Sequence, residues 1–261
     1  MQPKPYIGVT GVMTRKESEA LCDALSADND FLVMIGMLAS GKTIHGMPNK
    51  WPKRYPKAED MGKISFDHPK ALFLVHFNTK DPEKLHWDMC HALYLAGPHC
   101  HGLQLNIAWP DVRVLQDFHR DSQSDWCKTI VLQCGEKALD EVGWSGAKLA
   151  ERLKRYEGLI DYVLIDPSGG LGKEFDPDFA CRCFRMIAKT LPDVGLGIAG
   201  GLGSTNLGRL LGPILLAFPD LKFSIDVEAR VRDHADNLNV PDAIRYLKSG
   251  DLILGRKEAI C

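Results

Sequence analysis

The segment that decides the fold is YVLIDPSGGLGKEFD, residues 162–176. It begins with a short apolar run, reaches Asp166 and continues into a glycine-rich turn, which is typical of a buried strand followed by a loop. Two shorter segments of the same kind follow, AGGL at residues 199–202 and IDVE at residues 225–228. We therefore expect three successive strands whose carboxyl ends carry glycines and polar side chains.

Outward from this segment, short apolar runs alternate with stretches of helical spacing along all 261 residues. The predicted strands are Tyr6–Val9, Phe31–Met37, Ala71–Phe77, Gly102–Ile107, Thr129–Gln133, Tyr162–Asp166, Leu196–Ala199 and Phe223–Asp226. The predicted helices are Arg15–Ala27, Pro82–Leu95, Pro110–His119, Ala147–Tyr156, Pro177–Thr190, Thr205–Ala217 and Pro241–Lys248. This alternation predicts an α/β fold, and eight strands in a chain of this length favour a single (β/α)8 TIM barrel over an open doubly wound sheet.

Only the crossover after the second strand lacks a clean helix, and we predict a long loop there at about residues 39–68. Its start, GMLASGKT at residues 36–43, matches the nucleotide-binding pattern GxxxxGK[ST]. That motif requires a helix to follow, whereas the next residues are IHGMPN, which contain Gly and Pro. We interpret Lys42 as a substrate-binding cation on a loop that gathers anions with Lys50, Lys53 and Arg54, and keep nucleoside triphosphate hydrolysis as the lesser alternative.

The overall charge and the cysteines narrow the class of protein. The formal net charge is −2, so we expect no nucleic acid partner and no attraction to an anionic membrane. No signal peptide or membrane-spanning run is recognisable, and we expect a cytoplasmic protein, with a homodimer left open. The eight cysteines are scattered, and neither His99-Cys100-His101 nor Cys181-Arg182-Cys183 belongs to a paired ligand array, so we expect neither a metal nor a cofactor.

The glycine-rich turns predict a phosphorylated small-molecule substrate. Glycine lets backbone N–H groups approach a phosphate closely, and TIM barrels commonly bind phosphate at the loops after strands seven and eight. The predicted phosphate-binding residues are Gly170, Gly172, Gly200, Gly201 and Arg230.

These segments resemble the phosphoribosylanthranilate isomerase family, which are ribulose-phosphate-binding barrels of tryptophan synthesis. The matching residues are Asp166, Gly169, Gly170, Gly172, Phe175 and Asp176, then Ala199, Gly200, Gly201, Leu202 and Asn206, and more weakly Gly102–Leu105. The resemblance covers roughly residues 160–250. It implies that Asp166 is a general acid that protonates the ring oxygen of a phosphoribosylamine.

Two positions depart from the family pattern. Thr10-Gly11 stands where the family has a Cys-Gly pair whose thiol is the general base, and a hydroxyl cannot accept a proton near neutral pH without a base beside it. Cys134 could supply a thiol from another strand, although a buried structural cysteine is the commoner case. After strand eight, Arg230 could pair with a phosphate, whereas Glu228 would repel it.

The candidate catalytic residues are therefore Asp166, Thr10 and Asp226. His76, Gln104, Asn106 and Lys42 are the candidate substrate-binding residues; Asn106 stands where the family usually has histidine. The alternative for His76, Gln104 and Asn106 is a satisfied polar group of the core or of a loop, and for Asp166 a carboxylate that caps the turn after it.

Together these features predict an enzyme that acts on a phosphorylated sugar or phosphoribosyl compound, similar to the isomerase family but without its first-strand cysteine. One alternative is an N-ribosyl hydrolase, lyase or transferase, because a carboxylate also stabilises an oxocarbenium charge. Another is a phospho-ligand-binding protein without catalysis, since a fold alone does not establish an activity.

Overall fold

The structure, a computed structural model, describes residues 2–26, 29–121, 129–168 and 172–255. Its strands are all parallel and close into a barrel in the order β1 to β8, with β8 pairing β1. They are β1 Tyr6–Thr10, β2 Leu32–Ser40, β3 Ala71–Asn78, β4 Gly102–Leu105, β5 Thr129–Gly135, β6 Tyr162–Asp166, β7 Gly195–Ile198 and β8 Ser224–Val227. The predicted TIM barrel is confirmed.

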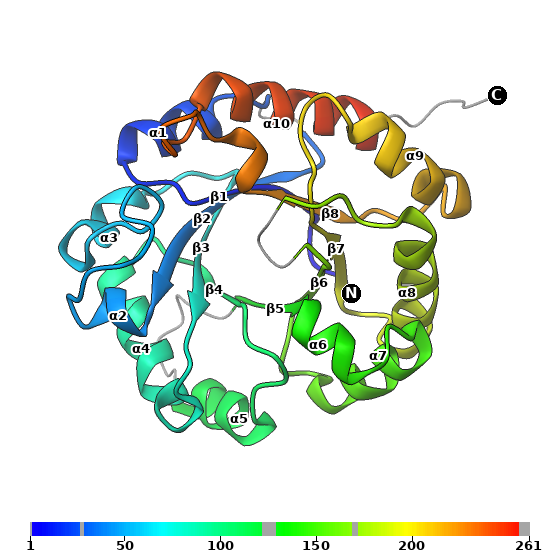
Figure 1. Ribbon diagram of the computed structural model, residues 1–261, viewed down its shortest axis with the longest axis horizontal. Coiled ribbons are helices and arrows are strands. Elements are labelled where there is room, and N and C mark those ends of the chain that lie inside the picture. The colour runs from blue at the N-terminus through cyan, green and yellow to red at the C-terminus, as the bar shows by residue number, and fades with distance from the viewer. Residues whose placement is uncertain (1, 27–28, 122–128, 169–171, 256–261) are drawn as a thin grey trace.

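Helices surround the barrel (Figure 1). The α-helices are α1 Arg15–Cys22, α2 Gly41–Ile44, α3 Ala58–Ile64, α4 Leu85–Ala96, α5 Val112–Asp121, α6 Glu136–Glu141, α7 Gly146–Leu153, α8 Pro177–Thr190, α9 Leu207–Ala217 and α10 Val240–Leu254. Three 3-10 turns, η1 Pro82–Lys84, η2 Lys154–Tyr156 and η3 Ala229–Val231, complete the elements of the described chain. None of the described helices is long and apolar enough to span a bilayer.

The largest differences from the sequence prediction lie after β2 and after β5. Strand β2 continues to Ser40, and the segment predicted as a loop holds α2 and α3. Ser40 and Thr43 form a capping box that starts α2, which ends after four residues. The short helix α6 was not predicted either, because six residues carry too little periodicity to stand out.

The side chains inside the barrel change from apolar to polar toward the carboxyl ends of the strands. An interior cluster consists of Tyr6, Met34, Leu72, Leu74, Val131, Tyr162, Leu164 and Ala199. Side chains two residues apart share a face of a strand, so Thr10 follows Tyr6 inward, His76 follows Leu74 and Asp166 follows Leu164. The apolar interior therefore ends in a polar layer at this end of the barrel, which we call the mouth.

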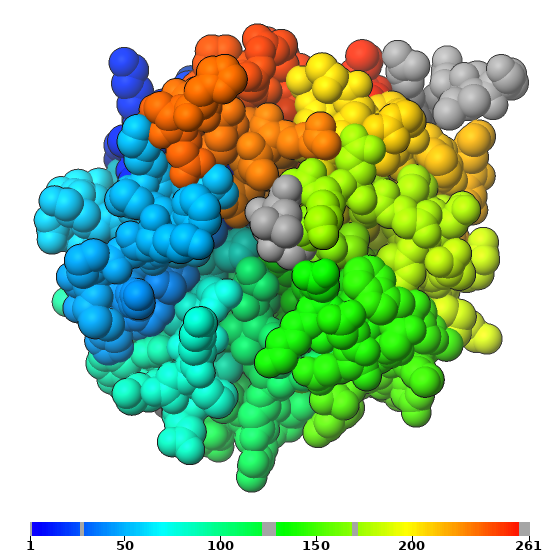
Figure 2. Space-filling view, viewed as in Figure 1, coloured from blue at the N-terminus to red at the C-terminus, as the bar shows by residue number. Residues whose placement is uncertain are grey.

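Figure 2 shows the molecule in space-filling form, viewed in the same direction. The light-blue segment after β2 lies beside the orange segment after β8, where Arg54 forms ion pairs with Glu228 and Asp236. Parts of the chain more than 170 residues apart thus meet at the mouth.

Candidate active site at the mouth of the barrel

A cavity at the mouth brings together most of the predicted site residues. It is lined by Thr10, His76, Gln104, Gln133, Leu164, Asp166, Ser168, Gly172, Ala199, Gly200, Gly201, Leu202, Asp226, Val227, Glu228, Ala229 and Arg230. Asn106 lines an adjoining hollow that shares Gln133 and Asp166 with the cavity, whereas Lys42 lines a further hollow beside that one. Gly170 lies outside the described residues.

Asp226 is the centre of a buried hydrogen-bond network. The Thr10 hydroxyl lies 3.0 and 3.1 Å from the two carboxylate oxygens of Asp226 and donates to them. Gln104 Nε2 donates to Asp226 Oδ2 at 3.1 Å. A Cβ at Gly36 would lie 2.5 Å from the Thr10 hydroxyl, so only glycine leaves room for that group. Thr10 is therefore placed beside a base, the condition that a hydroxyl needs to take part in proton transfer.

The network continues through two amides to Asp166. Gln104 Nε2 also donates to Gln133 Oε1 at 3.1 Å, and Gln133 Nε2 donates to Asp166 Oδ2 at 2.8 Å. Ser168 donates to Asp166 Oδ1 from its hydroxyl at 2.6 Å and from its backbone N–H at 3.1 Å. The two carboxylates are thus joined by the side chains of Gln104 and Gln133 across β4 and β5.

Sequence reasoning missed Gln133. The only signal in the sequence was its place at the end of an apolar strand, in the position that points into the barrel. Its role depends on three neighbouring strands, which no local pattern reveals.

Burial sets the protonation of Asp226. Its side chain is only 5% exposed, and desolvation raises its pKa to about 7. The hydrogen bonds from Gln104 and Thr10 act in the opposite direction, whereas the charges of Glu228 and Asp166 add to the rise. A carboxyl with such a pKa exchanges a proton readily at neutral pH, as general acid–base catalysis requires.

His76 is held neutral in the same cavity. Burial lowers its pKa to about 4, and the charge of Asp166 opposes this shift. Its Nδ1 atom and the Gln104 Oε1 atom are buried without a partner among the described residues. Because buried polar groups are usually hydrogen-bonded, both atoms are available to a substrate or to water.

The glycine turn after β7 forms the other side of the cavity. Gly201 has φ +65°, and a Cβ there would lie 2.6 Å from the backbone of Lys173 and Glu174. Asn206 Nδ2 donates to the Gly201 carbonyl at 2.8 Å and to Glu174 at 3.0 Å. The turn is therefore held in the left-handed conformation, which exposes backbone in a way that a residue with a side chain would hinder.

Arg230 reaches this side of the cavity while it also contacts Glu174. The distance from its Nη2 to Glu174 Oε1 is 3.4 Å, and Arg209 contacts the other carboxylate oxygen at 2.7 Å. The Arg230 side chain is 41% exposed. It therefore keeps donors free for an anion at the mouth.

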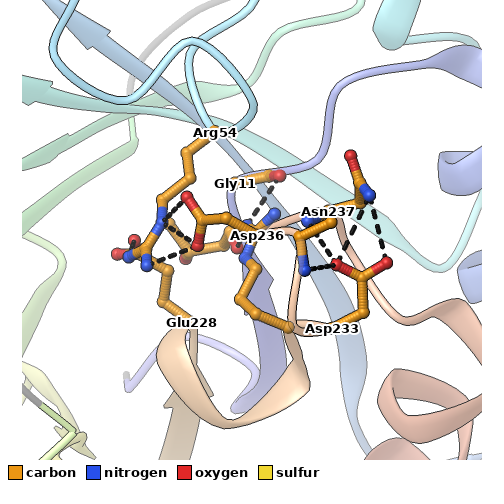
Figure 3. Close-up of polar contacts among 9 residues, drawn as sticks. Gly11, Arg54, Glu228, Asp233, Asp236 and Asn237 are labelled. Atoms are coloured by element: carbon orange, nitrogen blue, oxygen red, sulfur yellow. Dashed lines mark hydrogen bonds and ion pairs between the residues drawn. The ribbon is translucent and has the colours of Figure 1, made fainter.

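Arg54 joins the segment after β2 to the loop after β8 (Figure 3). Its guanidinium donates to both carboxylate oxygens of Asp236 and, at 2.8 Å, to Glu228 Oε1. Beside it, Arg232 donates to the carbonyls of Thr10 at 2.9 Å and Gly11 at 2.8 Å. The sequence grouped Arg54 with the anion-gathering lysines, but its charge is taken up by two carboxylates. The same contact offsets the Glu228 charge that was expected to repel a phosphate.

The GxxxxGKT segment and the cysteines, which suggested other functions in the sequence, have structural roles. Asn49 Nδ2 donates to Ser40 Oγ, and the Ser40 backbone N–H donates to the Thr43 hydroxyl, so the polar side chains of the GxxxxGKT segment cap its four-residue helix.

Cys134 is buried in the core outside the strands, where burial raises its pKa, and it does not line the cavity. Cys100 donates to backbone carbonyls. Within the described chain, no group of three or more His, Cys, Asp or Glu residues is placed to hold a metal ion.

Comparisons with known proteins give relatives by sequence and neighbours by fold. No family model matches the chain. It is 27% identical over 136 residues to N-(5'-phosphoribosyl)anthranilate isomerase of Erythrobacter litoralis, and 35% identical over 74 residues to the protein of that name from Methanoregula boonei. The matches cover 50% and 28% of this chain and 60% and 35% of those proteins, so less than two thirds of either relative is matched.

Solved structures show the same fold. Phosphoribosyl anthranilate isomerase from Thermus thermophilus superposes with a TM-score of 0.60 over 94% of this chain and 97% of that one, at 14% identity. The catalytic domain of a Pyrococcus furiosus chitinase gives a TM-score of 0.56 over 97% of each chain, at 13% identity. Likeness at such identities establishes the barrel alone. By sequence and by fold together, the chain is similar to the phosphoribosylanthranilate isomerases.

Proposed function

We propose that this protein is an enzyme of isomerase type that acts on a phosphorylated sugar or phosphoribosyl compound. The observation that carries the proposal is a pair of carboxylates, Asp166 and Asp226, that line one cavity and are joined by the amides of Gln104 and Gln133. The relatives named as isomerases support the same class of reaction.

The phosphate of the substrate would bind at the glycine side of the cavity. Gly172, Gly200 and Gly201 line it together with Arg230. Backbone amides at glycine turns and a guanidinium are the groups that proteins use most often for phosphate. The reacting part of the sugar then lies toward the two carboxylates.

Proton transfer by the pair would open and rearrange the sugar. One carboxyl gives its proton to the ring oxygen as the ring C–O bond breaks, and the other carboxylate removes a proton from the neighbouring carbon. The resemblance assigns the acid to Asp166, which leaves the base to Asp226. Asp226 thereby takes the place of the thiol that is missing at Thr10, whose hydroxyl donates to it.

Cleavage of an N-ribosyl bond is the second candidate, favoured by the threonine at position 10. Without a thiol, Asp166 could stabilise a ribosyl cation while water attacks. The two reactions differ in their products, since only cleavage releases free ribose 5-phosphate.

The test is turnover of phosphoribosyl anthranilate and of other N-ribosyl 5-phosphates by the wild type, Asp166→Asn and Asp226→Asn. We expect each substitution to lower kcat by about 100-fold or more, while ribose 5-phosphate still raises the melting temperature of both variants. Full activity in either variant would refute the assignment. A wild type that is stabilised by ribose 5-phosphate but turns over no ribosyl compound would be a binding protein instead.

A further inference from the structure

The mouth has a second hollow beside the reaction cavity. It is formed by the segments after β3, β4 and β5, and it shares Gln133 and Asp166 with the cavity. A third hollow toward α2 shares Asn78, Thr79, Lys80 and Pro82 with it. Figure 2 shows this side of the face hollowed between the turquoise segment after β3 and the green segment of α6. A ligand held over Asp166 can therefore extend into it.

The cations on this side of the mouth are not neutralised. Lys80 and Lys137 line the second hollow, and Lys42 and Lys50 line the third together with Lys80. None of these four lysines forms an ion pair with a residue that the structure describes. On the opposite side, by contrast, Arg54 is paired with Asp236 and Glu228.

The acidic residues on the same rim do not cancel this charge. Asp81 is already 3.2 Å from Lys84. Glu83, Glu136 and Asp166 remain, against the four lysines Lys42, Lys50, Lys80 and Lys137, so the lysines are still in excess around the two hollows. Unpaired charge of one sign around a concave surface concentrates ligands of the opposite sign.

The kind of side chain indicates the kind of anion. The planar guanidinium of arginine matches carboxylate and phosphate alike through two parallel hydrogen bonds, whereas lysine acts as a point charge and is a common phosphate ligand. The described lining of both hollows includes no arginine and no aromatic side chain, and its neutral polar groups include Asn78, Thr79 and Asn106. A compact, highly charged group fits this lining better than an aromatic ring.

We propose that the hollow after β3 to β5 binds a second phosphate group, so that the substrate is a bisphosphorylated sugar that spans the mouth. One phosphate lies at Gly200, Gly201 and Arg230, the other near Lys80 and Lys137, and the reacting carbons lie between them over Asp166. The inference rests on the proposed function for the first phosphate and adds the second.

Calorimetry with three probes tests the proposal: ribose 5-phosphate, ribulose 1,5-bisphosphate and 6-phosphogluconate, which carries one phosphate and one carboxylate. We expect the bisphosphate to bind at least about tenfold more tightly than the monophosphate at low salt, with a smaller ratio at high salt.

The Lys80→Ala/Lys137→Ala variant should bring the ratio of the two affinities close to one. Both lysines are exposed, so the substitutions leave the core intact. Lys248→Ala, on the exposed side of α10, is the control and should keep the ratio.

Equal affinity for the mono- and bisphosphate, or a ratio that survives the double substitution, would overturn the inference. If 6-phosphogluconate matches the bisphosphate with the same dependence on lysine, the second group is a carboxylate and the phosphate assignment is wrong. Failure of the proposed function looks different. In that case ribose 5-phosphate does not bind and Gly201→Ala leaves bisphosphate binding unchanged, while loss of that binding in the lysine variant still supports the subsite.

Discussion

Replacing the buried Asp226 by asparagine should stabilise the protein while it removes activity. The pKa of Asp226 is about 7 in the folded chain against an ordinary value of 3.8. Below pH 3.8 the carboxyl is protonated in both the folded and the unfolded state, so its ionisation does not lower the free energy of unfolding. Between pH 3.8 and pH 7 the unfolded chain releases the proton and the folded chain keeps it, so the free energy of unfolding falls as pH rises.

The size of this effect follows from the pKa difference. Each pH unit in the window corresponds to about 1.4 kcal/mol, so the wild type loses about 4 kcal/mol across it, as an upper bound. Asparagine keeps a carbonyl oxygen that can accept from Thr10 and Gln104 but carries no charge. The free energy of unfolding of Asp226→Asn, relative to wild type, should therefore be about 2 to 3 kcal/mol higher at pH 8 than at pH 5.

Urea denaturation at pH 5 and pH 8 measures this difference, with the exposed Asp220→Asn as the control that should show none. If Asp226→Asn raises the free energy of unfolding equally at both pH values, or lowers it at pH 8, then burial does not raise the pKa of Asp226 to about 7. The loss of turnover at the same position would make this a case in which stability is given up for catalysis.

The remaining predictions concern the mouth and its core. Arg54→Met leaves two carboxylates without their partner, so we expect a loss of about 1 to 3 kcal/mol in the free energy of unfolding and weaker binding of ribose 5-phosphate; unchanged affinity would mean that the ion pairs do not influence the cavity. Gly201→Ala places a Cβ 2.6 Å from backbone at φ +65°, and should cost about 1 to 3 kcal/mol and weaken phosphate binding. Gly208→Ala, in a helix where the new Cβ would face open space, should instead raise the melting temperature slightly. Cys134 is 1% exposed and should react with a thiol reagent only after unfolding, whereas the exposed Cys90 should react in the native protein; rapid native labelling of Cys134 would contradict its burial.

The sequence predicted those site residues that can be recognised from their immediate neighbours in the chain. Asp166 follows directly on an apolar run, and Gly200 and Gly201 stand together at the end of another, so strand ends and glycine turns can be found from the order of residues alone. Gln133 could not be found in this way. In the barrel Gln104 pairs by backbone with Val131, and Gln133 pairs with Leu164. The side chains of the two glutamines meet only because neighbouring strands are tilted and staggered.

The long segment after β2 is a second case. Its lysines and arginine look alike in the sequence, yet Arg54 is paired with Glu228 and Asp236, while Lys42 lines a separate hollow and forms no ion pair with a residue that the structure describes. The partners of Arg54 lie 174 and 182 residues away. Which cation is neutralised is decided by that long-range contact, and composition carries no information about it.

The sequence by itself determined the barrel, the strand ends that form its mouth and the acidic and glycine residues placed there, because the two-residue period of a strand and the punctuation by Gly and Pro are local properties. Only the tertiary structure decided that Thr10 donates to Asp226, that two amides join Asp226 to Asp166, and that burial raises the pKa of Asp226 to about 7. These features depend on burial and on contacts between residues as much as 216 positions apart. Desolvation and hydrogen-bond geometry arise only when the closed barrel brings such residues together.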